Sequence, residues 1–222
     1  MVKKMKPKRN KYTVGGLFSG VGGIEQGFEN NGFSISWANE FDPSACRTYR
    51  FNHKHTLIEK DIHELAGAEL PSVDVLTAGF PCQAFSVAGY RKGFQDDRGN
   101  LFFQIMRLVD EFEEKPKVLF LENVKNFKGH DGGNTFKTVC KEIESRGYSI
   151  FTQVLNTADY TDIPHNRERI FIICFRDERL WDLESSASCS RTFSSLFPPE
   201  KSANRKHIRD LLEKIKVEEK YY

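Results

Sequence analysis

The sequence predicts an open α/β fold with a mostly parallel sheet and helices wound on both of its faces. Apolar runs rich in β-branched residues alternate with helical patterns over residues 12–175, an arrangement typical of βαβ units. The first run leads through a glycine-rich turn into a helix, which is how doubly wound folds open. A length of 222 residues with 39% hydrophobic side chains is enough for one large domain with its own core.

Each element follows from its local pattern. Short apolar runs between turn residues predict strands at 12–18, 33–38, 56–59, 73–78 and 116–121. Helices are expected at 24–31, at 42–52, where Asp42 can cap the helix and Pro43 suits its first turn, and at 101–114 and 131–146. Residues 148–155 and 169–175 predict two more strands, paired as an antiparallel hairpin.

The glycine-rich turn and the acid that follows it predict a cofactor site. Gly20, Gly22 and Gly23 lie between the first strand and the first helix, so the backbone and the free N–H groups of the helix can approach a ligand. The spacing is not G-x-G-x-x-G, and the lysine of a P-loop is missing. Glu40 ends the second strand about twenty residues later, where ribose hydroxyls are held. Asp61 ends the third strand, and capping of the next helical turn is an equal alternative for it.

A cysteine follows the buried strand at 73–78. Cys82 comes directly after Gly79, Phe80 and Pro81, at the carboxyl edge of the sheet, where open α/β sheets bind ligands. Residues 83–100 then show no strand or helix pattern, as expected of a lid or binding loop. These features favour a nucleophilic thiol beneath a closing loop, although its position alone also fits an inert buried cysteine.

Charged residues at two other strand ends are candidates for the same pocket. Glu122 follows the strand at 116–121, and removal from water there would favour its protonated form and make it a proton donor. A surface acid that begins a loop is the alternative. Arg167 and Arg169 lie two apart as the last strand begins, so they face the same way and can reach an anionic or carbonyl-rich substrate. A solvated pair of salt bridges is the alternative.

Composition narrows the class of protein. No segment approaches the roughly 18 apolar residues of a membrane span, and the N-terminal residues lack the apolar stretch of a signal peptide. The five cysteines are odd in number and include no C-x-x-C pair, so we expect a reducing cytoplasm, no disulfide framework and no metal site. Residues 1–11 carry six positive charges and no acid, a basic arm that can hold phosphates or simply be solvated; the rest of the chain carries −4.

Taken together, the motifs resemble those of the cytosine-C5 DNA methyltransferases. The resemblance covers roughly residues 12–180 and implies the S-adenosylmethionine-dependent methyltransferase (Rossmann-like) sheet, parallel except for one reversed strand. It rests on six motifs in the order and spacing of that family: Phe18-Ser19-Gly20-Val21-Gly22-Gly23, Asn39-Glu40, Asp61-Ile62, Gly79-Phe80-Pro81-Cys82-Gln83, Glu122-Asn123-Val124 and Arg167-Glu168-Arg169.

The resemblance implies that Cys82, Glu122, Arg167 and Arg169 carry the chemistry. Cys82 would add to C6 of a cytosine flipped out of the duplex, because C5 by itself is a poor nucleophile. Glu122 would protonate or hydrogen-bond N3, Arg169 would hold O2, and Arg167 would hold the pocket or a phosphate. Methyl transfer to C5, loss of the C5 proton and expulsion of Cys82 would follow.

S-adenosylmethionine is the implied cofactor, with no metal. The methionine part would lie against the glycine turn, the ribose on Glu40, and the adenine between Phe41 and Ile62 with Asp61 on its exocyclic amine. The cofactor-binding residues implied are Phe18, Ser19, Gly20, Gly22, Gly23, Glu40, Phe41, Asp61, Ile62, Pro81 and Leu101.

Two departures from the pattern of the family matter. His165 stands where the family usually has Gln, which puts closure of the loop at 83–100 in question, although His can still donate one hydrogen bond. Residues 181–222 are an extension leading toward a target-recognition domain, and their last residues, 218–222, resemble the entry into that domain. The resemblance therefore implies a double-stranded DNA substrate and a second polypeptide that carries that domain, a late arginine motif and the final Gly-Asn-Ser-Val helix.

The leading interpretation is the catalytic subunit of a split DNA (cytosine-5-)-methyltransferase of a bacterial restriction–modification system, in the cytoplasm and on the nucleoid. Three alternatives stay open: a truncated fragment, a non-catalytic cofactor-binding module that regulates a methyltransferase, and an RNA cytosine methyltransferase. The presence of Cys82, Glu122, Arg167 and Arg169 together argues against the regulatory module.

Overall fold

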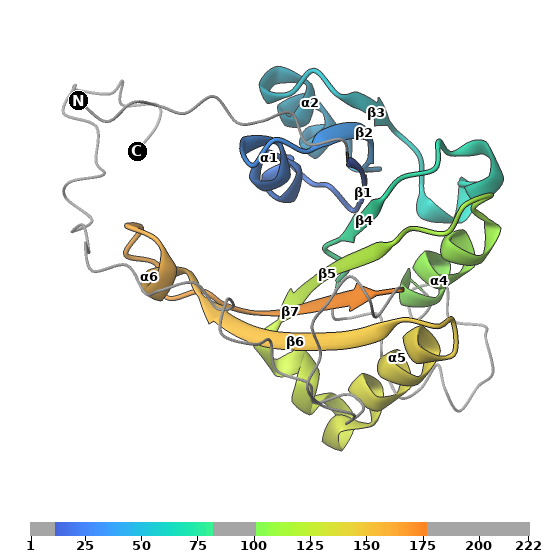
Figure 1. The fold of residues 1–222 in the computed structure, drawn as a ribbon. Coiled ribbons are helices and arrows are strands. Elements are labelled where there is room, and N and C mark those ends of the chain that lie inside the picture. The colour runs from blue at the N-terminus through green and yellow to red at the C-terminus, as the bar shows by residue number, and fades with distance from the viewer. Residues whose placement is uncertain (1–11, 82–100, 177–222) are drawn as a thin grey trace, which may run out of the picture.

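The structure, a computed structural model, describes residues 12–81 and 101–176. These residues form one seven-stranded sheet in the order β3-β2-β1-β4-β5-β7-β6 (Figure 1). The only antiparallel pairs in this part of the chain are those that β7 makes with β5 and β6, so the expected sheet with one reversed strand is confirmed. The strands are β1 (Thr13–Leu17), β2 (Ser34–Asn39), β3 (Thr56–Ile58), β4 (Val75–Ala78), β5 (Val118–Val124), β6 (Ser149–Asn156) and β7 (Glu168–Phe175).

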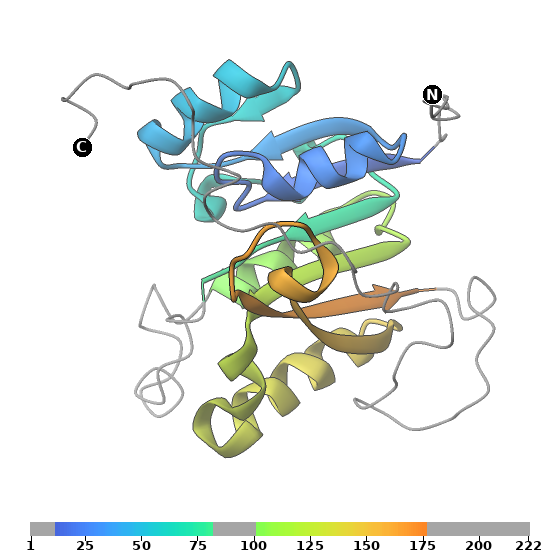
Figure 2. The same ribbon diagram turned by 90° about the vertical axis from the view of Figure 1, so that its left-hand side faces the viewer.

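Helices lie on both faces of the sheet. Seen from the side that Figure 2 shows, α1 (Gly23–Asn30) and the short α6 (Thr157–Tyr160) lie in front of the sheet and α4 (Leu101–Glu111) lies behind it. α5 (Asn134–Glu144) packs with α4, and α2 (Pro43–Asn52) joins β2 to β3. The 3-10 segments η1 (Ile62–Glu64) and η2 (Gly67–Glu69) lead from β3 to β4, and η4 (Lys125–Gly133) leads from β5 to α5. No helix within the described ranges is long and apolar enough to span a membrane.

The core lies on the α4 and α5 side of the sheet. Alternate residues of β5 and β7 are fully buried there and share one apolar cluster with residues of both helices. On the opposite face, Phe120 and Phe171 are only partly buried. One face of these two strands therefore belongs to the core, and the other is available to line a cavity.

Specific hydrogen bonds, strand pairing and backbone angles explain where α2, β5 and α5 begin or end. Asp42 accepts hydrogen bonds from Ser44 N at 2.9 Å and Ala45 N at 2.7 Å. It is therefore the N-cap of α2, as the sequence predicts, and the helix begins at the next residue. β5 continues through residues 122–124, because these residues pair with β7. α5 begins at Asn134 and not at 131, because residues 131–133 have positive φ angles.

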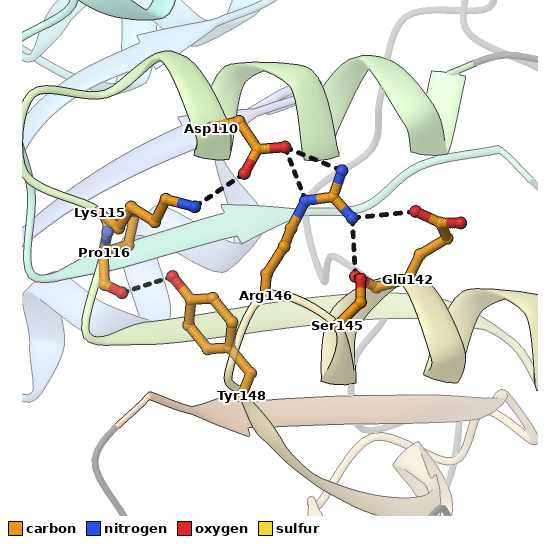
Figure 3. A network of polar contacts seen from close by, with 7 residues as sticks. All are labelled: Asp110, Lys115, Pro116, Glu142, Ser145, Arg146 and Tyr148. Atoms are coloured by element: carbon orange, nitrogen blue, oxygen red, sulfur yellow. Dashed lines mark hydrogen bonds and ion pairs between the residues drawn. The ribbon is translucent and has the colours of Figure 1, made fainter.

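A polar network ties α4, α5 and β5 together at the amino edge of the sheet (Figure 3). The Arg146 guanidinium donates to Asp110 Oδ2 at 2.8 Å and to Glu142 Oε2 at 2.9 Å. Lys115 Nζ donates to Asp110 Oδ1 at 2.8 Å, and the buried Tyr148 hydroxyl donates to the Pro116 carbonyl at 2.6 Å. This network lies at the opposite edge from the strand ends expected to form the site.

Asp74 joins the starts of three neighbouring strands. It accepts from Thr13 N at 2.8 Å and from Lys117 Nζ at 2.6 Å. Partial burial works against the charged carboxylate, but the hydrogen bonds from Lys117 and Thr13 outweigh it and lower the pKa of Asp74. Because the folded state has the lower pKa, ionised Asp74 stabilises the fold above the pKa of the unfolded chain, about 3.9, and this contribution is lost as the pH falls through the folded pKa.

We therefore expect Asp74→Asn to lower the free energy of unfolding at neutral pH. The difference from wild type should narrow as the pH falls below about 4, where the wild-type carboxylate also becomes protonated. Urea denaturation at neutral pH and at several values below about pH 5 measures it. A difference that stays constant over this range would contradict the assigned role of Asp74.

Candidate active site

Four strand ends meet at one edge of the sheet. β1, β4 and β5 are parallel and in register, with Ala78 between Leu17 and Leu121, so their carboxyl ends lie together. β7 runs the other way, so its first residues reach the same edge, and Arg169 lies opposite Val124. The sequence after β4, the end of β5 and the arginines of β7 therefore converge there.

Glu122 and Arg169 form an ion pair at this edge. Arg169 Nε lies 2.9 Å from Glu122 Oε1, and the two side chains are 22% and 21% exposed. Arg169 Nη1 also donates to the Glu168 carbonyl at 2.8 Å. A Cβ placed on Gly79 would lie 3.5 Å from Glu122 Oε2, so the carboxylate faces the segment that leads from β4 to Cys82. The structure thus brings together a carboxylate and a cation beside the strand that precedes the cysteine.

A cavity of about 880 Å³ lies between α1, α6 and the sheet. This volume is within the range of ligand pockets in proteins. Its floor includes Phe120 and Phe171 from the half-buried face of β5 and β7. The side chain of Arg167 is exposed, while its backbone N–H donates to Asn156 Oδ1 at 3.0 Å. Of the expected site residues, the cavity is lined by Phe18, Ser19, Gly23, Glu122, Arg167 and Arg169.

The glycine turn has backbone dihedral angles that few residues other than glycine adopt. Phe18 and Gly20 each have a φ of +55° and Gly22 a φ of +91°, all left-handed. The Ser19 N–H donates to the Asn39 carbonyl at 3.0 Å, and the Gly22 N–H donates to the Ser19 carbonyl at 2.8 Å. Gly22 caps α1 without a side-chain hydrogen bond in the described part of the chain, so the first turn of this helix can offer N–H groups to a ligand.

Glu40 is buried and fixed by backbone amides. Its Oε2 accepts from Gly20 N, and its Oε1 accepts from Phe41 N and Asp42 N, all at 2.8 Å. A carboxylate has about four acceptor sites, so these bonds leave about one for a ligand hydroxyl. Glu40 therefore joins the end of β2 to the glycine turn and keeps about one acceptor site.

Of the expected cofactor residues, those that do not line this cavity are Gly20, Gly22, Glu40, Phe41, Asp61, Ile62, Pro81 and Leu101. Phe41 is 64% exposed, and Ile62 is 3% exposed and belongs to the core. Asp61 Oδ1 accepts from His63 N at 2.9 Å, so Asp61 caps η1, and this backbone hydrogen bond is the main cause of its lowered pKa. Pro81 is exposed, and Leu101 is partly buried at the start of α4.

Two expected features lie at or beyond the limits of the described residues. Cys82 and the loop at 83–100 fall outside them, and Pro81 at the carboxyl edge is the last described residue before the cysteine.

His165, which stands where the family usually has Gln, is exposed, and its backbone N–H donates to the Ile163 carbonyl at 2.8 Å.

Sequence reasoning missed two asparagines that hold this edge together. Asn123 is 2% exposed, and its Nδ2 donates to the Phe80 carbonyl at 3.0 Å, which fixes the backbone two residues before Cys82. Asn39 Nδ2 donates to the carbonyls of Ile58 and Lys60 at 3.0 and 2.8 Å. An amide at the end of an apolar strand was the available signal, because a buried amide must find partners.

One group among the described residues has the composition of a metal site. Ligand atoms of Glu29, His53 and His55 all lie within 4.8 Å of one another. These atoms already have partners: His53 Nε2 lies 3.2 Å from the Val21 carbonyl, and His55 lies 2.9 Å from the Tyr49 hydroxyl and 3.2 Å from Glu29. We interpret the group as a hydrogen-bond network and assign no metal to it.

The family described as "C-5 cytosine-specific DNA methylase" matches residues 12–222. The chain belongs to this family. It is 54% identical over 166 residues to the Type II methyltransferase M.Bsp6I of Bacillus sp. (strain RFL6), covering 74% of this chain and 52% of that protein. It is 47% identical over 162 residues to M.HhaI of Haemophilus parahaemolyticus, covering 73% of this chain and 48% of that protein. The chain thus spans about half the length of these curated relatives.

Solved structures agree with this membership. A DNMT2 mutant of Spodoptera frugiperda superposes with a TM-score of 0.73 at 22% identity, over 95% of this chain and 62% of that one, which is a likeness of fold. A putative DNA modification methyltransferase encoded within a prophage of E. coli superposes with a TM-score of 0.64 at 26% identity, over 78% of this chain and 49% of that one. The fold of this chain is that of the S-adenosylmethionine-dependent methyltransferases.

Proposed function

We propose that this chain is the catalytic part of a DNA (cytosine-5-)-methyltransferase of a restriction–modification system. The observation that carries the proposal is the 2.9 Å pair of Glu122 and Arg169, which faces Gly79 and borders the same cavity as the glycine turn. Membership of the C-5 cytosine-specific methylases and similarity to Type II methyltransferases support it. Within the chain, residues 12–180 would form the catalytic domain.

In the proposed reaction Cys82 and Glu122 act on opposite sides of a flipped cytosine. The Cys82 thiolate forms a bond to C6, and the electron pair of the C5–C6 double bond moves through the ring to N3, which takes a proton from the Glu122 carboxyl. C5 then attacks a methyl carbon, and the pair of the broken carbon–sulfur bond stays on the departing sulfur. A base removes the proton from C5, the thiolate leaves C6, and N3 returns its proton to Glu122. Arg169 would hold O2 and stabilise the Glu122 carboxylate while it lacks its proton.

S-adenosylmethionine, when bound, supplies the methyl group. The described residues suit it: the left-handed glycine turn allows close backbone approach, and Glu40 keeps about one acceptor site for a ribose hydroxyl. The aromatic ring of Phe18 lies at the same cavity and offers an apolar surface. No metal enters the proposal.

The recognition part implied by the resemblance would have to come from outside these 222 residues. We propose a second polypeptide as its source; the curated relatives contain about as much chain again as the part that these residues match. Double-stranded DNA would then be held between the two polypeptides, with the target base flipped into the cavity at a cost of a few kcal/mol.

Covalent trapping tests this function. In DNA with 5-fluorocytosine at the target, fluorine cannot leave C5 as a proton does, so a Cys82 adduct would persist on a denaturing gel. The chain is mixed with S-adenosylmethionine, the half of M.Bsp6I that it does not match, and DNA that intact M.Bsp6I methylates. We expect an adduct with the wild-type chain and none with Cys82→Ala. An adduct with 5-fluorocytosine RNA only would replace the DNA assignment, and no adduct with either would contradict a catalytic role.

A further inference from the structure

The glycine turn is contacted by two buried side chains that have no role in the proposed reaction. Glu25, in the first turn of α1, is 1% exposed, and its Oε1 accepts from the Ser19 hydroxyl at 2.7 Å. His53, which follows α2, is 7% exposed, and its Nε2 lies 3.2 Å from the Val21 carbonyl, to which it donates when Nε2 carries the proton. The two contacts are made to alternate residues of one short turn.

The contacts leave no space between these side chains and the backbone. A Cβ on Gly16 would collide with the Glu25 carboxylate, and one on Gly22 would collide with the His53 ring. In a close-packed interior, such side chains cannot shift without moving the backbone that they touch. The position of the turn is therefore coupled to the positions of Glu25 and His53.

A second row of side chains supports His53. Its ring centre lies 4.6 Å from that of Tyr49 and 5.2 Å from that of His55. The Tyr49 hydroxyl lies 2.9 Å from His55 Nδ1, and His55 Nε2 lies 3.2 Å from Glu29 Oε1. Burial raises the pKa of Tyr49, so its hydroxyl stays protonated and can donate. His53 is therefore held against the turn by an ordered layer.

Glu25 is costly to keep where it is. Burial raises its pKa, against the opposing effects of the Ser19 hydroxyl, its own backbone N–H and the two nearby histidines. Its Oε2 has no hydrogen-bond partner in the part of the chain that the structure describes. A buried carboxyl with an unpaired oxygen lowers the stability of the fold. We therefore look for a role of Glu25, and of its bond to Ser19, other than stabilising the fold.

We propose that Glu25 and His53 are positioning residues that fix the turn at 19–22 in its cofactor-binding shape and so set the affinity for S-adenosylmethionine. Glu40 holds Gly20 through its backbone N–H, Glu25 holds the Ser19 hydroxyl, and His53 lies against the Val21 carbonyl. A turn rich in left-handed residues has many unbound conformations, and fixing it in advance lowers the entropy lost on binding. The inference deepens the proposed function and rests on its cofactor site.

Paired variants of the full chain separate the hydrogen bonds from packing. Glu25→Met and His53→Met remove the bonds at similar size, whereas Glu25→Gln keeps an acceptor for Ser19 and His53→Gln keeps a donor for Val21. We expect the Met variants to weaken the calorimetric Kd for S-adenosylmethionine and S-adenosylhomocysteine by about tenfold, and the Gln variants to stay within about threefold of wild type. The double Met variant should lose less than the product of the single losses, because both bonds restrain the same turn.

Tyr148→Phe is the matched control. It removes a buried hydrogen bond at the opposite edge of the sheet (Figure 3), so it should lower the thermal midpoint without changing either Kd. Met variants that lower the thermal midpoint while their Kd values stay at wild type would overturn the inference. If the Met variants do not fold, Ser19→Ala removes the Glu25 bond from its other end, and an unchanged Kd there would overturn the role of Glu25. A folded wild-type chain that binds neither compound would instead refute the proposed cofactor site.

Discussion

Cys82→Ser is expected to reduce methyl transfer by more than about a thousandfold while cofactor affinity stays within about twofold of wild type. A thiol is a few per cent ionised at neutral pH and is strongly nucleophilic, whereas a serine hydroxyl is not ionised and is a weak nucleophile. Cys82 follows β4 in the sequence, and its proposed role is on the cytosine and not on the cofactor. Transfer of a labelled methyl group to DNA, with the complementary half present, gives the rate, and calorimetry gives the Kd.

Cys174→Ala is the control for this experiment. Cys174 is fully buried in β7, and burial raises the pKa of its thiol, so it stays protonated and inert. Its replacement should lower stability slightly and leave the rate of methyl transfer unchanged. If Cys82→Ser turned over as fast as wild type, the covalent mechanism would have to be abandoned.

Glu122→Gln should lower kcat by roughly 10²–10³-fold with little change in cofactor Kd. The amide has the size of the carboxyl but can neither give a proton to N3 nor take it back. The substitution also removes the negative charge that pairs with Arg169 at 2.9 Å, so the guanidinium loses the ion pair that orients it. Single-turnover methyl transfer separates this effect on chemistry from any effect on DNA binding.

Glu168→Gln provides the same chemical change at the same edge. Glu168 alternates with Arg169 along β7, so it points to the other face, where it pairs with Lys125 at 2.8 Å, and it does not line the cavity. We expect its kcat to stay close to wild type. If both variants lost kcat equally, the loss would reflect any change of charge at this edge of the sheet. The specific role assigned to Glu122 would then be wrong.

Much of this fold follows from local signals, and the exceptions depend on distant contacts. The apolar runs, the Asp42 cap and the hairpin of β6 and β7 are visible in the sequence because each is decided by neighbouring residues. The extension of β5 through Glu122 is not, since it depends on pairing with a strand about fifty residues later. The bond from Gly20 N to Glu40 likewise requires the glycine turn to lie beside the end of β2, whereas the bonds from Phe41 N and Asp42 N are local.

The candidate site divides in the same way. Convergence of Glu122 and Arg169 could be expected, because the ends of parallel strands and the start of a reversed one share an edge. Glu25 and His53 could not, because a local explanation was already sufficient for each. An acid in the first turn of a helix suits the helix dipole, and a histidine after a helix suits its C-terminus, so neither pattern suggests burial against a turn.

The reversed direction of β7 determines where this part of the chain tolerates insertions and deletions. The connection at 157–167, which includes α6, lies outside the pairing of β6 with β7, so extra residues there leave the register intact. One residue inserted between Arg169 and Phe175 would shift the earlier part of the strand by one position and turn Arg169 to the opposite face. Changes of length in this region should therefore be found in the connection and not in the strand.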